Sequence, residues 1–306
     1  MAAGGFSFVA LLVLQGLPTG QTSLAAQELG LPPTAAPDAK LTEVYSGEGF
    51  YEGPMWDPAS GKLYFTGFFN SNQILQVLRL DEHGTATVWE GESQGVNGTF
   101  LSLEGRMLGA QGGAKGVVDW RIGENGPEDK KTFYQNDDLN QPNDLCQTAD
   151  GRIYFTDPNF QTQQSGVYLI KDGETVKIID DIPAPNGIMT SLDGRTLYIS
   201  DSGDKFWRSY PLDEDGLPGE EREFFKPDVQ NQNSPDGMTI DVDGNLYFAG
   251  RGGVWMVSPE GKALGFIPIP EFCSNVTFGG EDGKSLYMTC AGKLYTLRMT
   301  VTGAKR

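Results

Sequence analysis

The sequence predicts an all-β fold built from one repeated unit. A turn followed by a short strand, close to the pattern Gly-x-hydrophobic-Tyr, recurs along the chain, and helical periodicity is absent over any useful length. The 41 glycines and 18 prolines among 306 residues also favour many turns over long helices. The repeat glycines are spaced 44, 46, 43, 50 and 39 residues apart, at Gly61, Gly105, Gly151, Gly194, Gly244 and Gly283.

Each unit is long enough for four short strands, and six such units around one axis form a six-bladed β-propeller. Asp-Gly pairs at most copies predict tight hairpins, because glycine accepts a positive φ. A run of hairpins would also build a sandwich, which gives no reason for six near-equal periods. We therefore expect a propeller hydrolase domain over residues 41–300, in which residues 41–47 add an outer strand to the last blade and close the ring.

The N-terminal residues are typical of a signal peptide. Residues 6–14 form an apolar core that is too short to span a bilayer, and residues 23–25 offer a small-x-small cleavage site. We expect a signal peptide over residues 1–26, a linker over residues 27–40 and a tail over residues 301–306. The protein would then be exported, to a periplasm or to the cell exterior, without a membrane-spanning segment.

The net charge of −18 bears on the partners of the protein. An acidic surface of this size repels phosphate backbones and anionic lipid, so nucleic acid is excluded as an expected partner. It is compatible with a bound cation, although most of the charge keeps the surface solvated. We expect a small-molecule substrate.

Three cysteines, Cys146, Cys273 and Cys290, are an odd number and do not indicate a full disulfide framework. The absence of a C-x-x-C pair argues against a thiolate metal site. A single bond between Cys273 and Cys290 is one alternative. We favour buried thiols.

A carboxylate or carboxamide residue precedes every repeat glycine at nearly the same offset, eight residues in five units and nine in the first. The first strand of each propeller blade lines the central channel, so a residue at the start of that strand lies at one mouth of the channel. The six residues are Glu52, Asn97, Asn143, Asn186, Asp236 and Asn275. The sequence therefore predicts a ring of side-chain oxygens at the mouth. Asp157 and Asp201, at the ends of returning strands, are expected to line the outer funnel on the same face.

The ring has the chemistry of a cation site. Two carboxylates and four amide oxygens are hard ligands that favour Ca²⁺, with Mg²⁺ or Mn²⁺ behind it and Zn²⁺ as a further alternative. Without a cation, carboxylates facing each other in a low-dielectric funnel repel. Asn and Asp also cap turns, which explains one or two positions but not the same offset six times.

The single histidine, His83, lies in the polar stretch LDEHGTATV, and we expect it in a solvated turn. A Ser-His-Asp triad or a histidine-ligated zinc site is therefore not expected. Asn97 and Asn275 match the N-glycosylation pattern, but their ring positions inside the funnel argue against a glycan.

Several motifs together identify a family resemblance. EGPMWD begins at Glu52, QPNDL contains Asn143, APNGIMTSLDGRTLYISD contains Asn186 and SPDGMTIDVDGNLY contains Asp236. With these motifs in this order, residues 41–299 resemble the gluconolactonase, or senescence-marker-protein-like (regucalcin), family.

The resemblance implies a six-bladed propeller with one divalent cation at the channel mouth and hydrolysis of sugar lactones. It implies Glu52, Asn143, Asn186 and Asp236 as metal ligands, Asn143 also as a substrate-binding residue and Asp236 as the proton acceptor. Some members carry an Arg two residues before the third-blade Asn, where it holds the sugar, and Gln141 stands there in this chain. We expect substrate contacts from Gln141 and, in pocket-wall positions, from the residues Asn97, Asn275, Asp157 and Asp201.

These observations lead to one main functional hypothesis and two alternatives. The main hypothesis is metal-dependent hydrolysis of a lactone, such as gluconolactone or a related small lactone, by water activated near the cation. The first alternative is a phosphotriesterase-like or arylesterase-like hydrolase on the same metal. The second is a non-catalytic ligand-binding propeller with a structural calcium ion, since a fold does not by itself give a function.

Overall fold

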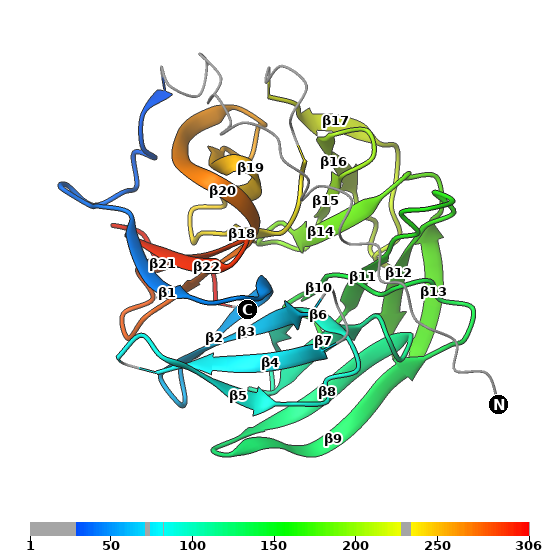
Figure 1. Cartoon of the computed structure of the whole chain (residues 1–306). Coiled ribbons are helices and arrows are strands. Elements are labelled where there is room, and N and C mark those ends of the chain that lie inside the picture. Colours follow the sequence, from blue (N-terminus) through cyan, green and yellow to red (C-terminus); the bar gives the residue numbers. More distant parts are fainter. Residues whose placement is uncertain (1–28, 71–73, 82, 228–233, 306) are drawn as a thin grey trace.

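The computed structural model describes residues 29–305, apart from residues 71–73, 82 and 228–233. The described residues form 22 strands, whose sheets surround a central axis as in a β-propeller (Figure 1). The all-β propeller prediction is therefore confirmed. The expected signal peptide over residues 1–26 lies outside the described residues.

Four of the sheets contain four strands each, and successive strands pair antiparallel. The first contains β2 (Phe50–Asp57), β3 (Lys62–Phe69), β4 (Ile74–Leu80) and β5 (Ala86–Glu90). The second contains β6 (Val96–Leu101), β7 (Met107–Gln111), β8 (Gly116–Gly123) and β9 (Gly126–Gln135). The third contains β10 (Leu145–Gln147), β11 (Ile153–Asp157), β12 (Gly166–Lys171) and β13 (Glu174–Ile179). The fourth contains β14 (Pro185–Thr190), β15 (Thr196–Asp201), β16 (Phe206–Pro211) and β17 (Arg222–Phe225).

The last sheet has six strands, in the order β1-β22-β21-β20-β19-β18. Its members are β18 (Met238–Ile240), β19 (Leu246–Val257), β20 (Ala263–Gly279), β21 (Ser285–Cys290), β22 (Lys293–Arg298) and β1 (Thr42–Ser46). Our prediction of six separate blades is wrong, because the described strands form five sheets. The cause is β20, which runs without a break from Phe266, opposite Trp255 in β19, to Val276, opposite Met288 in β21.

The N-terminal strand closes the ring as predicted. β1 pairs antiparallel with β22, which places Thr42 opposite Thr296 and Ser46 opposite Lys293. A side-chain hydrogen bond joins the last sheet to the first, since Ser274 Oγ donates to the carbonyl oxygen of Tyr51 at 2.6 Å. The two ends of the propeller domain are therefore tied together both within one sheet and between sheets.

The six repeat glycines all have the positive φ that tight turns require. Their φ angles lie between 66° and 90°, at Gly61, Gly105, Gly151, Gly194, Gly244 and Gly283. A side chain in this region of φ is strained. The repeat read from the sequence is therefore a repeat of turns at the end of each innermost strand.

Aromatic side chains fill the spaces between the strands. Trp207 in β16 stacks on Phe248 in β19 with ring centroids 4.7 Å apart. Both rings are fully buried and belong to a core cluster shared by the third, fourth and last sheets. Packing of this kind fixes the positions of the innermost strands, and with them the mouth of the channel.

Residues 29–40, which we expected to be part of a linker, lie against the last sheet. Thr34 Oγ1 is 2.8 Å from the hydroxyl of Tyr247, and the amide of Thr300 donates to the Thr34 carbonyl at 2.7 Å. The C-terminal tail lies nearby, where the amide of Ala304 donates to the carbonyl of Ile240. In the described part of the chain, no helix is both long enough and apolar enough to cross a membrane.

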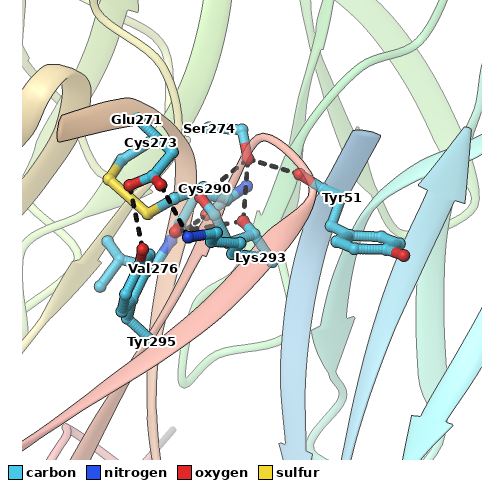
Figure 2. The surroundings of a disulfide bond; sticks show 10 residues. Tyr51, Glu271, Cys273, Ser274, Val276, Cys290, Lys293 and Tyr295 are labelled. Carbon is cyan, nitrogen blue, oxygen red and sulfur yellow. Dashed lines mark hydrogen bonds and ion pairs between the residues drawn. A yellow bond between two sulfur atoms is a disulfide. The ribbon is translucent and has the colours of Figure 1, made fainter. Parts of the chain in front are cut away.

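Cys273 and Cys290 form a disulfide (Figure 2). They lie directly opposite each other on β20 and β21, so their side chains point to the same face of the sheet. Our expectation of thiols at these two positions is therefore wrong, because the sequence spacing does not reveal the register of the strands. Cys146 is buried and is not part of a disulfide.

Candidate active site at the channel mouth

The six residues of the predicted ring lie at the starts of the first strands of the repeat units. Each is buried, with between 6% and 9% of its surface exposed. Glu52 lies in β2, Asn97 in β6, Asn143 just before β10, Asn186 in β14, Asp236 just before β18 and Asn275 in β20. The equivalent offsets in the sequence thus correspond to equivalent places in the fold.

Hydrogen bonds between neighbouring units close these positions into a ring. Thr99 Oγ1 donates to the carbonyl of Gly53 at 2.6 Å, and the amide of Gly98 donates to the carbonyl of Asn143 at 2.7 Å. Thr156 Oγ1 donates to the carbonyl of Asn186 at 2.6 Å, and Ser202 Oγ donates to the carbonyl of Pro235 at 2.6 Å. The amide of Gly237 donates to the carbonyl of Ser274 at 2.7 Å. With the bond from Ser274 to the first sheet, the backbones at the mouth hold one another in place.

The residue that follows the ring position is glycine in four units, where the strands approach each other closely. A Cβ atom added to Gly53 would lie 2.0 Å from the carbonyl oxygen of Asn97. One added to Gly187 would lie 2.3 Å from the carbonyl oxygen of Asp236, and one added to Gly237 would lie 2.0 Å from Cγ of Asn275. Real Cβ atoms do not come this close, so glycine is what permits a narrow ring at this level.

Asp144 occupies the same position in the third unit, and our interpretation of the sequence gave it no role in the site. It is buried, and its Oδ1 accepts from the amide of Leu145 at 2.8 Å. A Cβ added to Gly98 would lie 2.2 Å from Asp144 Oδ1, so the missing side chain at Gly98 makes room for this carboxylate. The sequence signal was an acidic residue where the other units have glycine or, in one case, valine.

Three buried carboxylates consequently share the mouth. Burial, and then the charge of Asp144, raises the pKa of Glu52 to about 8. Burial raises the pKa of Asp144 to about 7. Burial, and then the charges of Glu52 and Asp144, raises the pKa of Asp236 well above its usual value. The three groups repel one another when ionised, because the buried site has a lower dielectric constant than water and screens their charges less.

Side-chain oxygens at the mouth also lack hydrogen-bond donors. Asn97 Oδ1 and Asp236 Oδ1 are buried and have no partner in the described part of the protein. Such oxygens and a surplus of negative charge fit a cation with oxygen ligands. Among the described residues, no three His, Cys, Asp or Glu side chains are arranged to hold a metal ion. A cation at the mouth would therefore need the asparagine amides as well as the carboxylates.

Asp157 and Asp201 do not lie on the funnel surface, where we expected them. Both are fully buried. Asp157 accepts from the amides of Asn140 at 2.9 Å and Gln141 at 2.6 Å. Asp201 Oδ2 lies 2.7 Å from Nη2 of Arg208. Asp201 thus turns inward to hold the loop that follows β15, and Asp157 holds the loop that precedes β10.

The other sequence-predicted residues occupy varied places. Gln141 is partly buried in the loop that Asp157 holds, next to Gly112 of the second unit. Asn275 Oδ1 accepts from the amide of Val276, and its Nδ2 lies 3.5 Å from Asp144 Oδ2. This side chain therefore contacts the buried carboxylates at the mouth. His83 is exposed in a turn, as predicted.

The chain matches a known family model over residues 50–292, described as the SMP-30/Gluconolactonase/LRE-like region. This match covers most of the propeller and every ring residue. The protein belongs to this family. The resemblance inferred from the sequence motifs is therefore confirmed.

Relatives of known name agree with the family. A gluconolactonase of Zymomonas mobilis is 29% identical over 233 residues, which cover 68% of this chain and 64% of the relative. The alignment thus spans just under two thirds of that protein. Pentonolactonase XacC of Haloferax volcanii is 26% identical over 247 residues, 79% of this chain and 81% of the relative. The solved structure of a gluconolactonase from Xanthomonas campestris has a TM-score of 0.76 and 26% identity, covering 87% of this chain and 91% of that one.

Proposed function

We propose that this protein is a lactone-hydrolysing esterase that acts on sugar lactones or related small lactones at the channel mouth. The observation that carries the proposal is the ring of side-chain oxygens at the mouth, in which Asn97 Oδ1 and Asp236 Oδ1 have no hydrogen-bond partner among the described residues. The family membership and the names of the two relatives support the reaction class.

We assign a divalent cation, Ca²⁺ first among the candidates, to Glu52, Asn143, Asn186 and Asp236. Their carboxylate and amide oxygens are the hard ligands that Ca²⁺ takes, and the set contains no thiolate or imidazole. The raised pKa values of Glu52 and Asp236 show the cost of leaving these carboxylates without a counter-charge. When bound, such a cation polarises an ester carbonyl and stabilises the oxyanion formed on it.

Asp236 is assigned as the proton acceptor of the reaction. A water molecule forms a new bond to the lactone carbonyl carbon and passes a proton to Asp236, whose Oδ1 has no hydrogen-bond partner in the part of the chain that the structure describes. The ring C–O bond then breaks, and the proton passes from Asp236 to the departing alkoxide, which gives the open hydroxy acid. Burial raises the pKa of Asp236 in the metal-free protein, and a bound cation would lower it again and keep the carboxylate ionised, as a proton acceptor must be.

Residues of the ring and of the adjoining loop that are not assigned to the cation would orient the substrate. Asn97 offers an amide at the mouth, and Gln141 is held in the adjoining loop by Asp157. Asn275 would act on the carboxylates, since it contacts Asp144. We do not assign substrate contacts to Asp157 and Asp201, because both carboxylates are buried and hydrogen-bonded inside the protein.

A panel of lactones and metals tests this function. Purified protein stripped with a chelator would be assayed on γ- and δ-aldonolactones, a simple aliphatic lactone, an aryl ester and a phosphotriester, with Ca²⁺, Mg²⁺, Mn²⁺ or Zn²⁺ restored in turn. We expect metal-dependent opening of aldonolactones. Metal binding without hydrolysis of any substrate would instead indicate a structural ion in a non-catalytic propeller.

We also propose that the protein is exported through a signal peptide over residues 1–26. The disulfide between Cys273 and Cys290 supports this, because such bonds persist in oxidising compartments. N-terminal sequencing of the protein from its native cell tests the proposal. We expect the leader to be removed near Ala25 or Ala26, whereas an intact Met1 in a cytoplasmic fraction would refute export.

A further inference from the structure

Three side chains form a rim beside the ring of oxygen donors, which we call the aromatic–cationic rim: Phe50, Phe272 and Arg251. The rings of Phe50 and Phe272 are stacked with an interplanar angle of 21° and centroids 6.3 Å apart. The guanidinium carbon of Arg251 lies 6.0 Å from the centroid of the Phe272 ring. All three residues are partly exposed.

The rim lies just outside the mouth of the channel. Phe50 precedes Glu52 by two residues, and Phe272 precedes Asn275 by three. Asp236 is bonded across the sheet to Ala249, whose carbonyl accepts from the Asp236 amide at 3.1 Å. Arg251 is two residues beyond Ala249, about 7 Å further along the strand direction. All three rim residues therefore stand on the outward side of the acidic ring.

The backbone after Arg251 is shaped by a register shift between Arg251 and Gly253 within β19. Gly252 and Gly253 have φ angles of 86° and 141°, and a Cβ added to Gly253 would lie 1.9 Å from the carbonyl oxygen of Ile267. Arg251 also lies directly opposite Phe272 in the β19–β20 ladder. The position of Arg251 is thus set by an irregular, glycine-dependent stretch of β19 and by a cross-strand neighbour.

None of the described Asp or Glu side chains forms an ion pair with Arg251. Arg106, Arg152 and Arg208, by contrast, each pair with at least one aspartate. Glu271 directly precedes the rim residue Phe272 in the sequence. Its carboxylate lies 3.0 Å from Lys293 Nζ and accepts a hydrogen bond from the hydroxyl of Tyr295, also at 3.0 Å (Figure 2). Contact with an aromatic face uses no N–H group, so the donors of Arg251 stay available to a ligand.

We propose that the aromatic–cationic rim selects lactones that carry a negatively charged group, a carboxylate, sulfonate or phosphate, away from the reacting carbonyl. The planar guanidinium fork matches the oxygens of such groups. The two phenylalanine rings give the apolar face of the sugar a surface to lie on. In a protein with a net charge of −18, an arginine that has no acidic partner among the described residues and lies beside the mouth offsets the repulsion that such a substrate meets.

This inference rests on the proposed lactonase function, and a matched pair of substrates separates the two. Glucono-1,5-lactone and its 6-phosphate differ only in the charged group. We expect Arg251→Gln to lower kcat/KM for the phosphorylated lactone about 10- to 100-fold, the usual range for loss of a charge-assisted hydrogen bond, and to change the neutral one less than about 3-fold. Arg251→Lys should retain part of the preference for the phosphorylated lactone.

The matched control is Arg195→Gln, which removes the same charge from an exposed turn at the far end of the strands. It should leave the ratio between the two substrates unchanged. For the wild type, the ratio of kcat/KM for the phosphorylated lactone to that for the neutral lactone should also fall as salt is added, because added ions screen exposed charges. A substrate ratio that Arg251→Gln leaves unaltered would overturn the proposal, whatever the absolute rates.

If neither lactone is hydrolysed, the lactonase proposal fails while the rim can still be tested by binding. Calorimetry would then compare 1,5-anhydroglucitol with its 6-phosphate, neither of which can be hydrolysed as a lactone. Tighter binding of the phosphate by the wild type, lost in Arg251→Gln, supports the rim. Equal affinities of both compounds for both proteins would refute it.

Discussion

Asn275 Nδ2 lies 3.5 Å from Asp144 Oδ2, although the two residues are 131 positions apart in the chain. Asn275 begins the last repeat unit and Asp144 the third, so this contact crosses the channel between sheets that are not neighbours in the ring. Asn275 also hydrogen-bonds to Glu52 and favours its ionised form. A single amide therefore offsets part of the repulsion between two of the three buried carboxylates.

The stability of the metal-free protein should fall as pH rises. The pKa values of Asp144 and Glu52 are raised in the folded state to about 7 and about 8, so the folded state holds these protons more tightly than the unfolded state. Their stabilising effect is complete below pH about 4 and is lost as pH rises toward 8, by at most about 1.4 kcal/mol per pH unit for each group.

Thermal unfolding between pH 4 and 9, with chelator and then with Ca²⁺, measures this effect. We expect the melting temperature of the chelated protein to drop across that range and added Ca²⁺ to restore it most at high pH, where the carboxylates are ionised. Asp144→Asn should flatten the chelated profile. Parallel profiles with and without Ca²⁺ would argue against a cation at the mouth.

Asp236→Ala should abolish most of the hydrolytic activity and weaken metal binding, since Asp236 is assigned both as a ligand and as the proton acceptor. We expect a loss in kcat/KM of about 100-fold or more, which is the scale of general base catalysis. Asn275→Ala should cost much less, because it alters the carboxylates only indirectly. Steady-state kinetics and metal titration of both variants test which substitution costs more. Equal losses of kcat/KM in the two variants would contradict the roles assigned to Asp236 and Asn275.

The sequence predicted the features that depend on local repeats. Glycine at the turns and a polar residue at one offset before it were enough to place the innermost strands and the ring. The extent of β20 was not predictable in the same way, because no Gly or Asp interrupts residues 266–275 to mark the boundary between two units. The pairing of Cys273 with Cys290 depends on strand register, which sequence spacing does not give.

Side-chain direction was the other limit. Asp157 and Asp201 are the last residues of β11 and β15, whereas the ring residues lie near the starts of the innermost strands. A polar residue at a strand end can face the channel or hold a neighbouring loop. Asp144 was missed for the opposite reason, since the offset pattern selects one residue per unit and ignores its neighbour. Only the packed positions of Gly98 and Asn275 around it show that its carboxylate enters the channel.

Arg208→Ala should destabilise the fold without acting on the chemistry of the mouth. The guanidinium is largely buried and contacts Asp201, Asp204 and Glu221 at 2.6–2.7 Å. Its removal leaves the buried Asp201 without its cation, and we expect a loss of about 3–5 kcal/mol in the free energy of unfolding.

Urea denaturation of Arg208→Ala measures that loss. The control is Arg121→Ala, which removes an exposed ion pair with Glu128 and should cost less than about 1 kcal/mol. Similar losses in the free energy of unfolding of both variants would show that the buried ion pairs of Arg208 stabilise the fold no more than an exposed pair does.

Gly237→Ala should damage the active site from within the backbone of the ring. A Cβ at this position would lie 2.0 Å from Cγ and 2.2 Å from Oδ1 of Asn275, so either Asn275 or the strand that carries Asp236 must move. Movement of either group disturbs the acidic cluster. We expect a loss of activity of at least about 10-fold together with a destabilisation of about 1–3 kcal/mol, the usual cost of overpacking.

Gly91→Ala is the matched control, because its added Cβ would meet only Val88 at an ordinary 3.8 Å. If Gly237→Ala keeps the metal affinity, stability and turnover of the unmodified protein, the ring does not depend on the close approach of its strands, and the geometry that supports the proposed site would have to be abandoned.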